Sequence, residues 1–105
     1  MRLRLEYFDQ NESFAKLLPQ EGRVDRIVSS RDGQRWALFQ FDRSVTYEGR
    51  NYDYVLLRSR WSGQEIGEQE PTSVFIVLVE DFARVTDGLA IDAFSHVAWG
   101  TVSIL

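Results

Sequence analysis

The chain has 105 residues, a length that suits one domain and leaves little room for a second hydrophobic core. It contains no cysteine, which excludes a disulfide framework and any cysteine-ligated metal, while 44% hydrophobic and 13% aromatic residues are values of a globular protein. The formal net charge of −4 argues against a protein that coats nucleic acid through phosphate contacts, so we expect no nucleic-acid partner.

The first residues, MRLRLEYFDQ, interleave charges with apolar side chains and contain no apolar run long enough for a signal peptide or a membrane span. We therefore expect a complete, acidic, cytoplasmic protein with no membrane partner, and the lack of cysteine suits that reducing compartment. Within this segment Leu3, Leu5 and Tyr7 alternate with charged residues, which is the period of a half-buried strand. The pattern predicts β structure over residues 2–8.

Residues 9–22 have the pattern of a short helix of about two turns. Asn11 or Ser13 offers an N-terminal cap, and apolar residues then recur at helical spacing. Pro19 and Gly22 end the pattern, since neither residue continues a helix readily. The sequence therefore predicts one helix between the first strand and the second.

Two hairpins are predicted next. Residues 23–30 and 34–42 flank Asp32-Gly33, a dipeptide typical of tight antiparallel turns. A second hairpin has its turn at residues 48–51 and continues as a long strand over residues 52–61. Aromatic and β-branched residues flank that second turn, which favours strands on both sides of it.

The remaining segments are also mostly extended. Residues 72–80, TSVFIVLVE, are nearly continuously apolar and rich in β-branched side chains, which predicts a strand covered on both faces. Asp87-Gly88 indicates another turn, and residues 100–105 indicate a closing strand. Between them, residues 89–99 fit either a kinked strand or one short helix, and we favour the strand.

Frequent turns and short strands predict a mainly β, single-domain protein over residues 1–105, built as an antiparallel barrel or a two-sheet sandwich. It has one short N-terminal helix and, if residues 89–99 are helical, a short C-terminal helix. Tight hairpins leave no room for βαβ crossovers in the first 80 residues. If residues 2–8 or the C-terminal TVSIL form an uncovered edge strand, the chain has a route to a homodimer.

Motifs of known chemistry are missing from the sequence: it has no phosphate-binding glycine loop, no HExxH, no GxSxG and no EF-hand loop. His96 is the only histidine, so a metal site would need mainly carboxylates, and no suitable spacing for one occurs. We expect no metal and no cofactor. As catalytic candidates, only Glu70 and His96 offer a general acid or base, and His96 fits equally a partly exposed, hydrogen-bonded side chain packed beside Trp99.

The candidate site is the end of the strand predicted over residues 52–61. Alternation along this strand places aromatic, aliphatic and basic side chains on one face: Tyr52, Tyr54, Leu56, Arg58 and Arg60. If residues 72–80 pair with this strand, the loop over residues 62–72 brings three carboxylates to the two arginines: Glu65, Glu68 and Glu70. Tyr52 and Tyr54 fit either cross-strand packing in the hairpin or a partner interface.

Two hypotheses describe these charges. In the structural one, Glu70 or Glu68 pairs with Arg58 or Arg60 and Trp61 covers the end of the core, and each exposed pair contributes at most about 1 kcal/mol. In the functional one, an arginine stays unpaired and, with Trp61, binds a carboxylate, a phosphate or an acidic partner peptide.

Because catalytic signatures are missing, we expect a non-catalytic protein-binding or regulatory module that uses Arg58, Arg60, Trp61 and the 62–72 loop. Its partner would be another protein or a second copy of the chain. The alternative is a small enzyme that holds a small anionic substrate through Arg58 and Arg60, with Glu70 or His96 as general acid or base.

Overall fold

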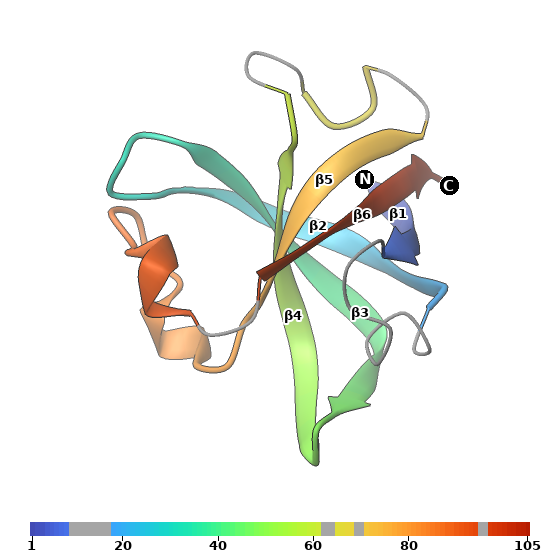
Figure 1. Cartoon of the computed structure of the whole chain (residues 1–105), viewed down its shortest axis with the longest axis horizontal. Coiled ribbons are helices and arrows are strands. Elements are labelled where there is room, and N and C mark those ends of the chain that lie inside the picture. The colour runs from blue at the N-terminus through green and yellow to red at the C-terminus, as the bar shows by residue number, and fades with distance from the viewer. Residues whose placement is uncertain (9–17, 62–64, 69–70, 95–96) are drawn as a thin grey trace.

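The computed structural model describes residues 1–8, 18–61, 65–68, 71–94 and 97–105 (Figure 1). Within them, six strands form a closed antiparallel barrel in which each strand pairs with the next in the chain and β1 pairs with β6. The strands are β1 (Arg2–Phe8), β2 (Gln20–Ser29), β3 (Arg35–Tyr47), β4 (Arg50–Ser59), β5 (Thr72–Leu78) and β6 (Val97–Ile104). The predicted mainly β fold is confirmed, as a barrel and not a sandwich. No helix of the described residues is long and apolar enough to cross a membrane.

Both predicted hairpins are present, with one difference in the second. The Asp32-Gly33 turn is confirmed, since Gly33 has a φ of 84° and its N–H donates to the Ser30 carbonyl at 2.9 Å. The second turn is shorter than predicted, because β3 ends at Tyr47 and β4 begins at Arg50. Only Glu48 and Gly49 lie between them, and both have the positive φ (51° and 75°) of a two-residue hairpin turn. β3 is continuous where two strands were predicted, and a register shift in its pairing with β4 lies between Gln40 and Val45.

The predicted helix over residues 9–22 lies largely outside the described residues, but its predicted end is wrong. Gln20, Glu21 and Gly22 belong to β2 and pair with β1. Gly22 ends no helix, and a Cβ at this position would lie 2.0 Å from the carbonyl oxygen of Gln40. The glycine marks a close approach between two strands.

Residues 79–94, which we call the strap, leave β5 and cross the outside of the barrel (orange in Figure 1). The strap contains two 3-10 helices, η1 (Phe82–Arg84) and η2 (Ile91–Ala93). The strand predicted over residues 89–99 is therefore wrong for residues 89–94, although β6 begins at Val97.

Hydrogen bonds fasten the strap to the end of β2. The predicted Asp87-Gly88 turn is confirmed, with a φ of 84° at Gly88. The Gly88 N–H donates to the Ser29 carbonyl at 2.7 Å, and the Ser29 N–H donates to Asp87 Oδ1 at 3.0 Å. Leu89 then accepts a hydrogen bond from the Arg31 N–H at 2.7 Å, so the strap is held along the tip of the first hairpin.

The strap explains why the middle of the barrel is apolar on both faces. Inside the barrel, buried strand residues form one cluster, which includes Leu3, Phe39, Leu57, Ile76 and Val102. Outside it, a second cluster joins strand residues to the strap and includes Val28, Leu38, Leu56, Val77 and Leu89. The prediction that residues 72–80 are covered on both faces is confirmed by β5, which contributes to both clusters.

Candidate functional site

A row of alternating rings and guanidinium groups lies on the outer face of the barrel beside the second cluster. On β4, β5 and β6 the register pairs Arg58 with Phe75 and Phe75 with Trp99. The Arg58 guanidinium carbon lies 5.2 Å from the ring centroid of Trp36 on β3 and 4.8 Å from that of Phe75. The Phe75 and Trp99 rings meet edge to face with their centroids 5.5 Å apart.

Arg60 and Trp61 extend this row beyond the end of β4. The Arg60 guanidinium carbon lies 4.1 Å from the Trp99 ring centroid and 5.3 Å from that of Trp61. The backbone N–H of Arg60 donates to the Ser73 carbonyl at 2.9 Å, which holds the main chain against β5. The Trp61 N–H reaches the buried Ser59 hydroxyl at 3.4 Å, while Trp61 itself remains 57% exposed. We call the whole set the ring–arginine row: Trp36, Arg58, Phe75, Trp99, Arg60 and Trp61.

The two arginines have different surroundings. Arg58 is stacked on both sides, its Nη1 donates to Gln34 Oε1 at 3.3 Å, and its Nε is buried without a hydrogen-bond partner. The pKa of the Asp32 carboxyl is lowered, chiefly by hydrogen bonds that it accepts from the Ser30 hydroxyl and the Gln34 N–H. The positive charge of Arg58 lowers this pKa as well, as the smallest of the causes. The Arg58 side chain is therefore packed into the surface of the barrel, partly buried and hydrogen-bonded to Gln34. The Arg60 guanidinium lies against the Trp99 and Trp61 rings.

The predicted glutamate clamp does not form among the described residues, where no carboxylate lies within ion-pair distance of Arg58 or Arg60. Glu65 faces a cavity instead, and Glu68 N–H donates to the Glu65 carbonyl at 3.3 Å. Glu70 and His96, the candidate acid–base residues, lie outside the described residues. The structural hypothesis is therefore wrong for Glu68, and a pair through Glu70 stays a prediction.

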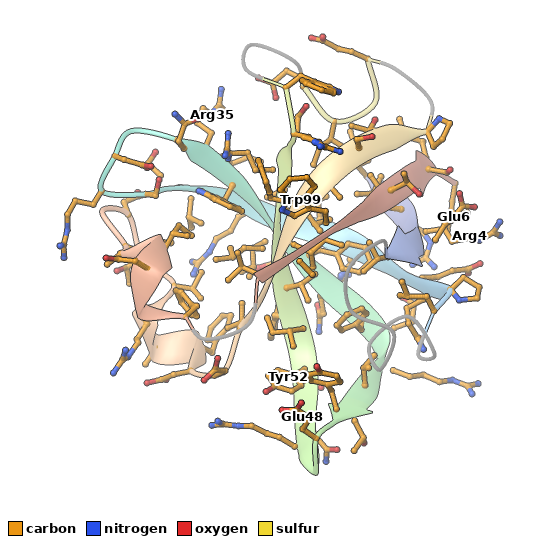
Figure 2. All side chains as sticks on the ribbon, viewed as in Figure 1. Arg4, Glu6, Arg35, Glu48, Tyr52 and Trp99 are labelled. Atoms are coloured by element: carbon orange, nitrogen blue, oxygen red, sulfur yellow. The ribbon has the colours of Figure 1, made fainter. Side chains whose placement is uncertain are left out.

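Arginines elsewhere on the barrel do meet carboxylates. Arg2 donates to both oxygens of Asp42 at 3.1 and 2.7 Å, and Arg4 pairs with Glu21 at 3.0 Å. Arg4 and Glu6, which also lie 3.7 Å apart, project from the β1 side of the barrel (Figure 2). These exposed pairs form a solvated surface, and the ring–arginine row differs from it in having rings as neighbours.

The two predicted tyrosines do not join the arginines. Tyr54 does share the outer face, but its ring packs on Phe82 of the strap, with centroids 4.7 Å apart. The expectation that Tyr52 lies on this face is wrong, since Tyr52 is buried in the interior cluster near the β3–β4 turn (Figure 2). The register shift after Gln40 offsets the simple alternation there. Burial raises the pKa of Tyr52, and the nearby Glu80 carboxylate raises it further.

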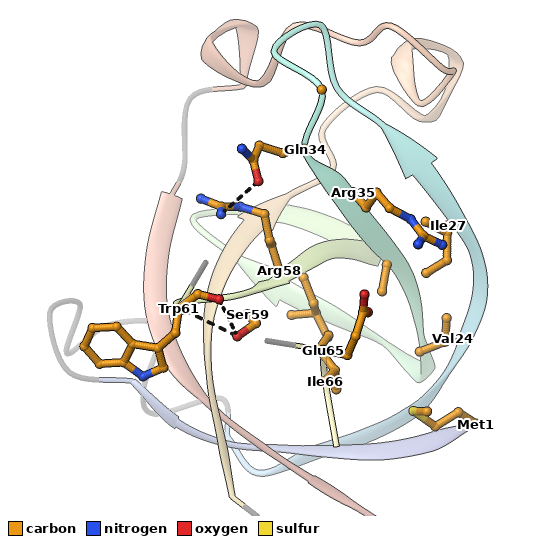
Figure 3. Close-up of a pocket in the computed structure, with 13 residues that line it drawn as sticks. Met1, Val24, Ile27, Gln34, Arg35, Arg58, Ser59, Trp61, Glu65 and Ile66 are labelled. Carbon is orange, nitrogen blue, oxygen red and sulfur yellow. Dashed lines mark hydrogen bonds between the residues drawn. The ribbon is translucent and has the colours of Figure 1, made fainter. Parts of the chain in front are cut away.

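A cavity of about 320 Å³ opens at the end of the barrel where β3 begins and β4 ends (Figure 3). Its floor consists of apolar side chains: Val24, Ala37, Leu57 and Ile66. Polar side chains also line it: Gln34, Arg35, Arg58, Ser59 and Glu65. Ile66 packs against the interior cluster, so the described part of the 62–72 loop lies over the barrel mouth.

The described residues contain no group of three His, Asp or Glu side chains arranged to hold a metal ion. No family model, curated protein or solved structure matches the chain. The fold and the site define a small antiparallel β-barrel that carries a ring–arginine row on its outside and a cavity at one mouth.

Proposed function

We propose that the chain is a non-catalytic protein-binding module whose ring–arginine row binds an acidic segment of a partner protein. The observation that carries the proposal is the position of Arg60, which lies over the Trp99 and Trp61 rings and forms no ion pair with any described residue. A guanidinium that stacks through its faces keeps its N–H edge available for bidentate hydrogen bonds to a carboxylate.

The surroundings of Arg60 favour tight recognition. The backbone N–H of Arg60 is bonded to Ser73 and its guanidinium stacks on Trp99, so less conformational freedom is lost when a partner binds. Trp61 is exposed beside it and supplies apolar contact area, and Trp and Arg are among the residues most enriched at energetic centres of interfaces. A net charge of −4 disfavours an extended nucleic acid and is compatible with one acidic segment that contacts the row alone.

Another protein is a better partner than a second copy of the chain. The homodimer route through an edge strand needs an unpaired β1 or β6, but these two strands pair with each other from Leu3 and Ile104 to Phe8 and Gly100. The chain therefore offers no open edge at either strand. We also propose a cytoplasmic location, because a fold without cysteine needs no oxidising compartment.

The proposal is tested by selecting binding peptides from a random display library and measuring their affinities with purified protein. We expect the selected peptides to be enriched in Asp and Glu. Arg60→Gln should weaken their binding roughly 10- to 100-fold, since hydrogen bonds to charged groups contribute about 1.5–3 kcal/mol. Added salt should weaken wild-type binding as well.

Arg43→Gln is the matched control, because Arg43 is exposed on β3 near its far end and should leave affinity unchanged. Peptides without acidic enrichment, or equal affinities for wild type and Arg60→Gln, would show the proposal to be wrong. Tighter binding of oligonucleotides than of any acidic peptide would assign the surface to nucleic acid instead.

A further inference from the structure

The cavity at the barrel mouth is a separate feature from the ring–arginine row, although Arg58 and Trp61 border both. Its volume of about 320 Å³ lies at the lower end of the range of small-molecule sites, which is about 300–1,000 Å³. Ala37 and Leu57 of the floor belong to the interior cluster, so the cavity continues the core of the barrel. Its size and apolar floor suit a small ligand with an apolar body.

Two opposite charges face this cavity from different elements. Glu65 enters from the 62–72 loop with its carboxylate pointing into the opening, and Arg35 lies on the β2–β3 side beside Ile27 (Figure 3). Neither side chain has an ion pair with any residue in the described part of the chain. Among the described residues, the mouth thus presents the Glu65 carboxylate and the Arg35 guanidinium above an apolar floor, neither of them in an ion pair. Arg58 is a second cation without an ion pair in the lining, and it is stacked on Trp36 and Phe75.

We infer that the barrel mouth binds a small zwitterion with an apolar side chain, of the chemical class of leucine or phenylalanine. The ligand ammonium would pair with Glu65, its carboxylate would pair with Arg35, and its apolar side chain would lie on Ala37 and Leu57. A plain carboxylate would meet Glu65 as a like charge, and a plain amine would meet Arg35 and Arg58. The charge pattern therefore favours a ligand that carries both groups.

The rim supports the same ligand class. Ile27 is 47% exposed and Met1 is 63% exposed, so apolar surface continues from the floor to the edge of the mouth. Covering that surface is favourable in proportion to the apolar area removed from water. The Gln34 side chain also borders the cavity and supplies a neutral hydrogen-bonding group.

The experiment measures binding by calorimetry and by two-dimensional NMR for three related molecules: leucine, isocaproate, which lacks the ammonium, and isopentylamine, which lacks the carboxylate. The protein carries no N-terminal tag, because Met1 lines the cavity. We expect leucine to bind wild type roughly 10-fold or more tightly than either analogue, since each analogue lacks one charge-assisted contact.

Two variants assign the charges separately. Glu65→Gln should weaken leucine binding to the level of isocaproate, and Arg35→Gln should weaken it to the level of isopentylamine. Glu68→Gln and Arg43→Gln, which remove charges outside the cavity, are the matched controls and should bind leucine as wild type does. Shifted amide signals should map to the strands of the barrel mouth.

Absence of saturable leucine and phenylalanine binding at millimolar concentration would overturn the inference. So would equal binding of isocaproate and leucine to wild type, which would define an anion site, or unchanged leucine affinity in both charge variants. Arg60→Gln should retain wild-type leucine binding, so the outcome here is distinguishable from that of the peptide experiment.

Discussion

Gly22 provides a stringent test of the barrel geometry. It pairs with Leu3 of β1 on one side and Phe41 of β3 on the other, and a Cβ here would lie 2.0 Å from the Gln40 carbonyl oxygen and 2.7 Å from Phe39 Cζ. Because the nearest atom is backbone, Gly22→Ala must push strands apart, and we expect the upper end of the usual overpacking range, about 3 kcal/mol. For a domain of this size, that loss lowers Tm by roughly 12–24 °C.

The assay is thermal and urea unfolding of wild type and Gly22→Ala, followed by circular dichroism. Gly33→Ala is the control, because Gly33 has a φ of 84° and a Cβ added to it would meet no atom within 4 Å. That change carries only the conformational cost of a left-handed residue, about 1–2 kcal/mol. If Gly22→Ala loses no more stability than Gly33→Ala, the inferred close approach of β2 and β3 is wrong.

Two further predictions concern the strap and the interior. Leu89→Ala should reduce the free energy of unfolding by about 2–5 kcal/mol, because Leu89 is buried in the outer cluster. Phe82→Ala is the control and should reduce it clearly less, because Phe82 is 47% exposed. Equal losses in urea titrations would show that the strap is not packed on the barrel. The raised pKa of Tyr52 means that the folded protein keeps this proton at pH values where the unfolded chain releases it, so stability should fall as pH rises above about 10. Tyr52→Phe should reduce that fall in Tm between neutral and alkaline pH, and an unchanged pH profile would contradict the assignment.

Local patterns predicted the strands and turns of the barrel well. The alternation of Leu3 and Leu5 identifies β1, and Asp32-Gly33 and Asp87-Gly88 identify two turns, because these signals depend only on nearby residues. The helix end predicted at Gly22 is wrong, since a glycine that ends a helix and one that admits a neighbouring strand look the same in sequence. Only the position of Gln40 across the sheet distinguishes them.

The candidate site was predicted in part. Alternation correctly grouped Arg58 with Tyr54 and Leu56 on one face, but it did not say which face is the outer one. Trp36, Phe75 and Trp99 were not recognised as neighbours of Arg58, because cross-strand register is set by turns and bulges. The predicted pairing of residues 72–80 with the preceding strand could have identified Phe75 as a neighbour of Arg58, since one choice of register puts these two residues opposite each other. Sequence alone offered no means of choosing that register over its alternatives.

The pairing of β1 with β6 also has a consequence for how the chain reaches its native state. Leu3 pairs with Ile104, so the ring closes only when the last strand is present. Contacts so distant in sequence slow folding, because the entropy of a long loop is lost before the pairing is gained. During synthesis β1 is made before β6 and stays without this partner until β6 has been made, which leaves a strand edge open to other nascent chains. Removal of β6 alone would expose the edges of β1 and β5 together.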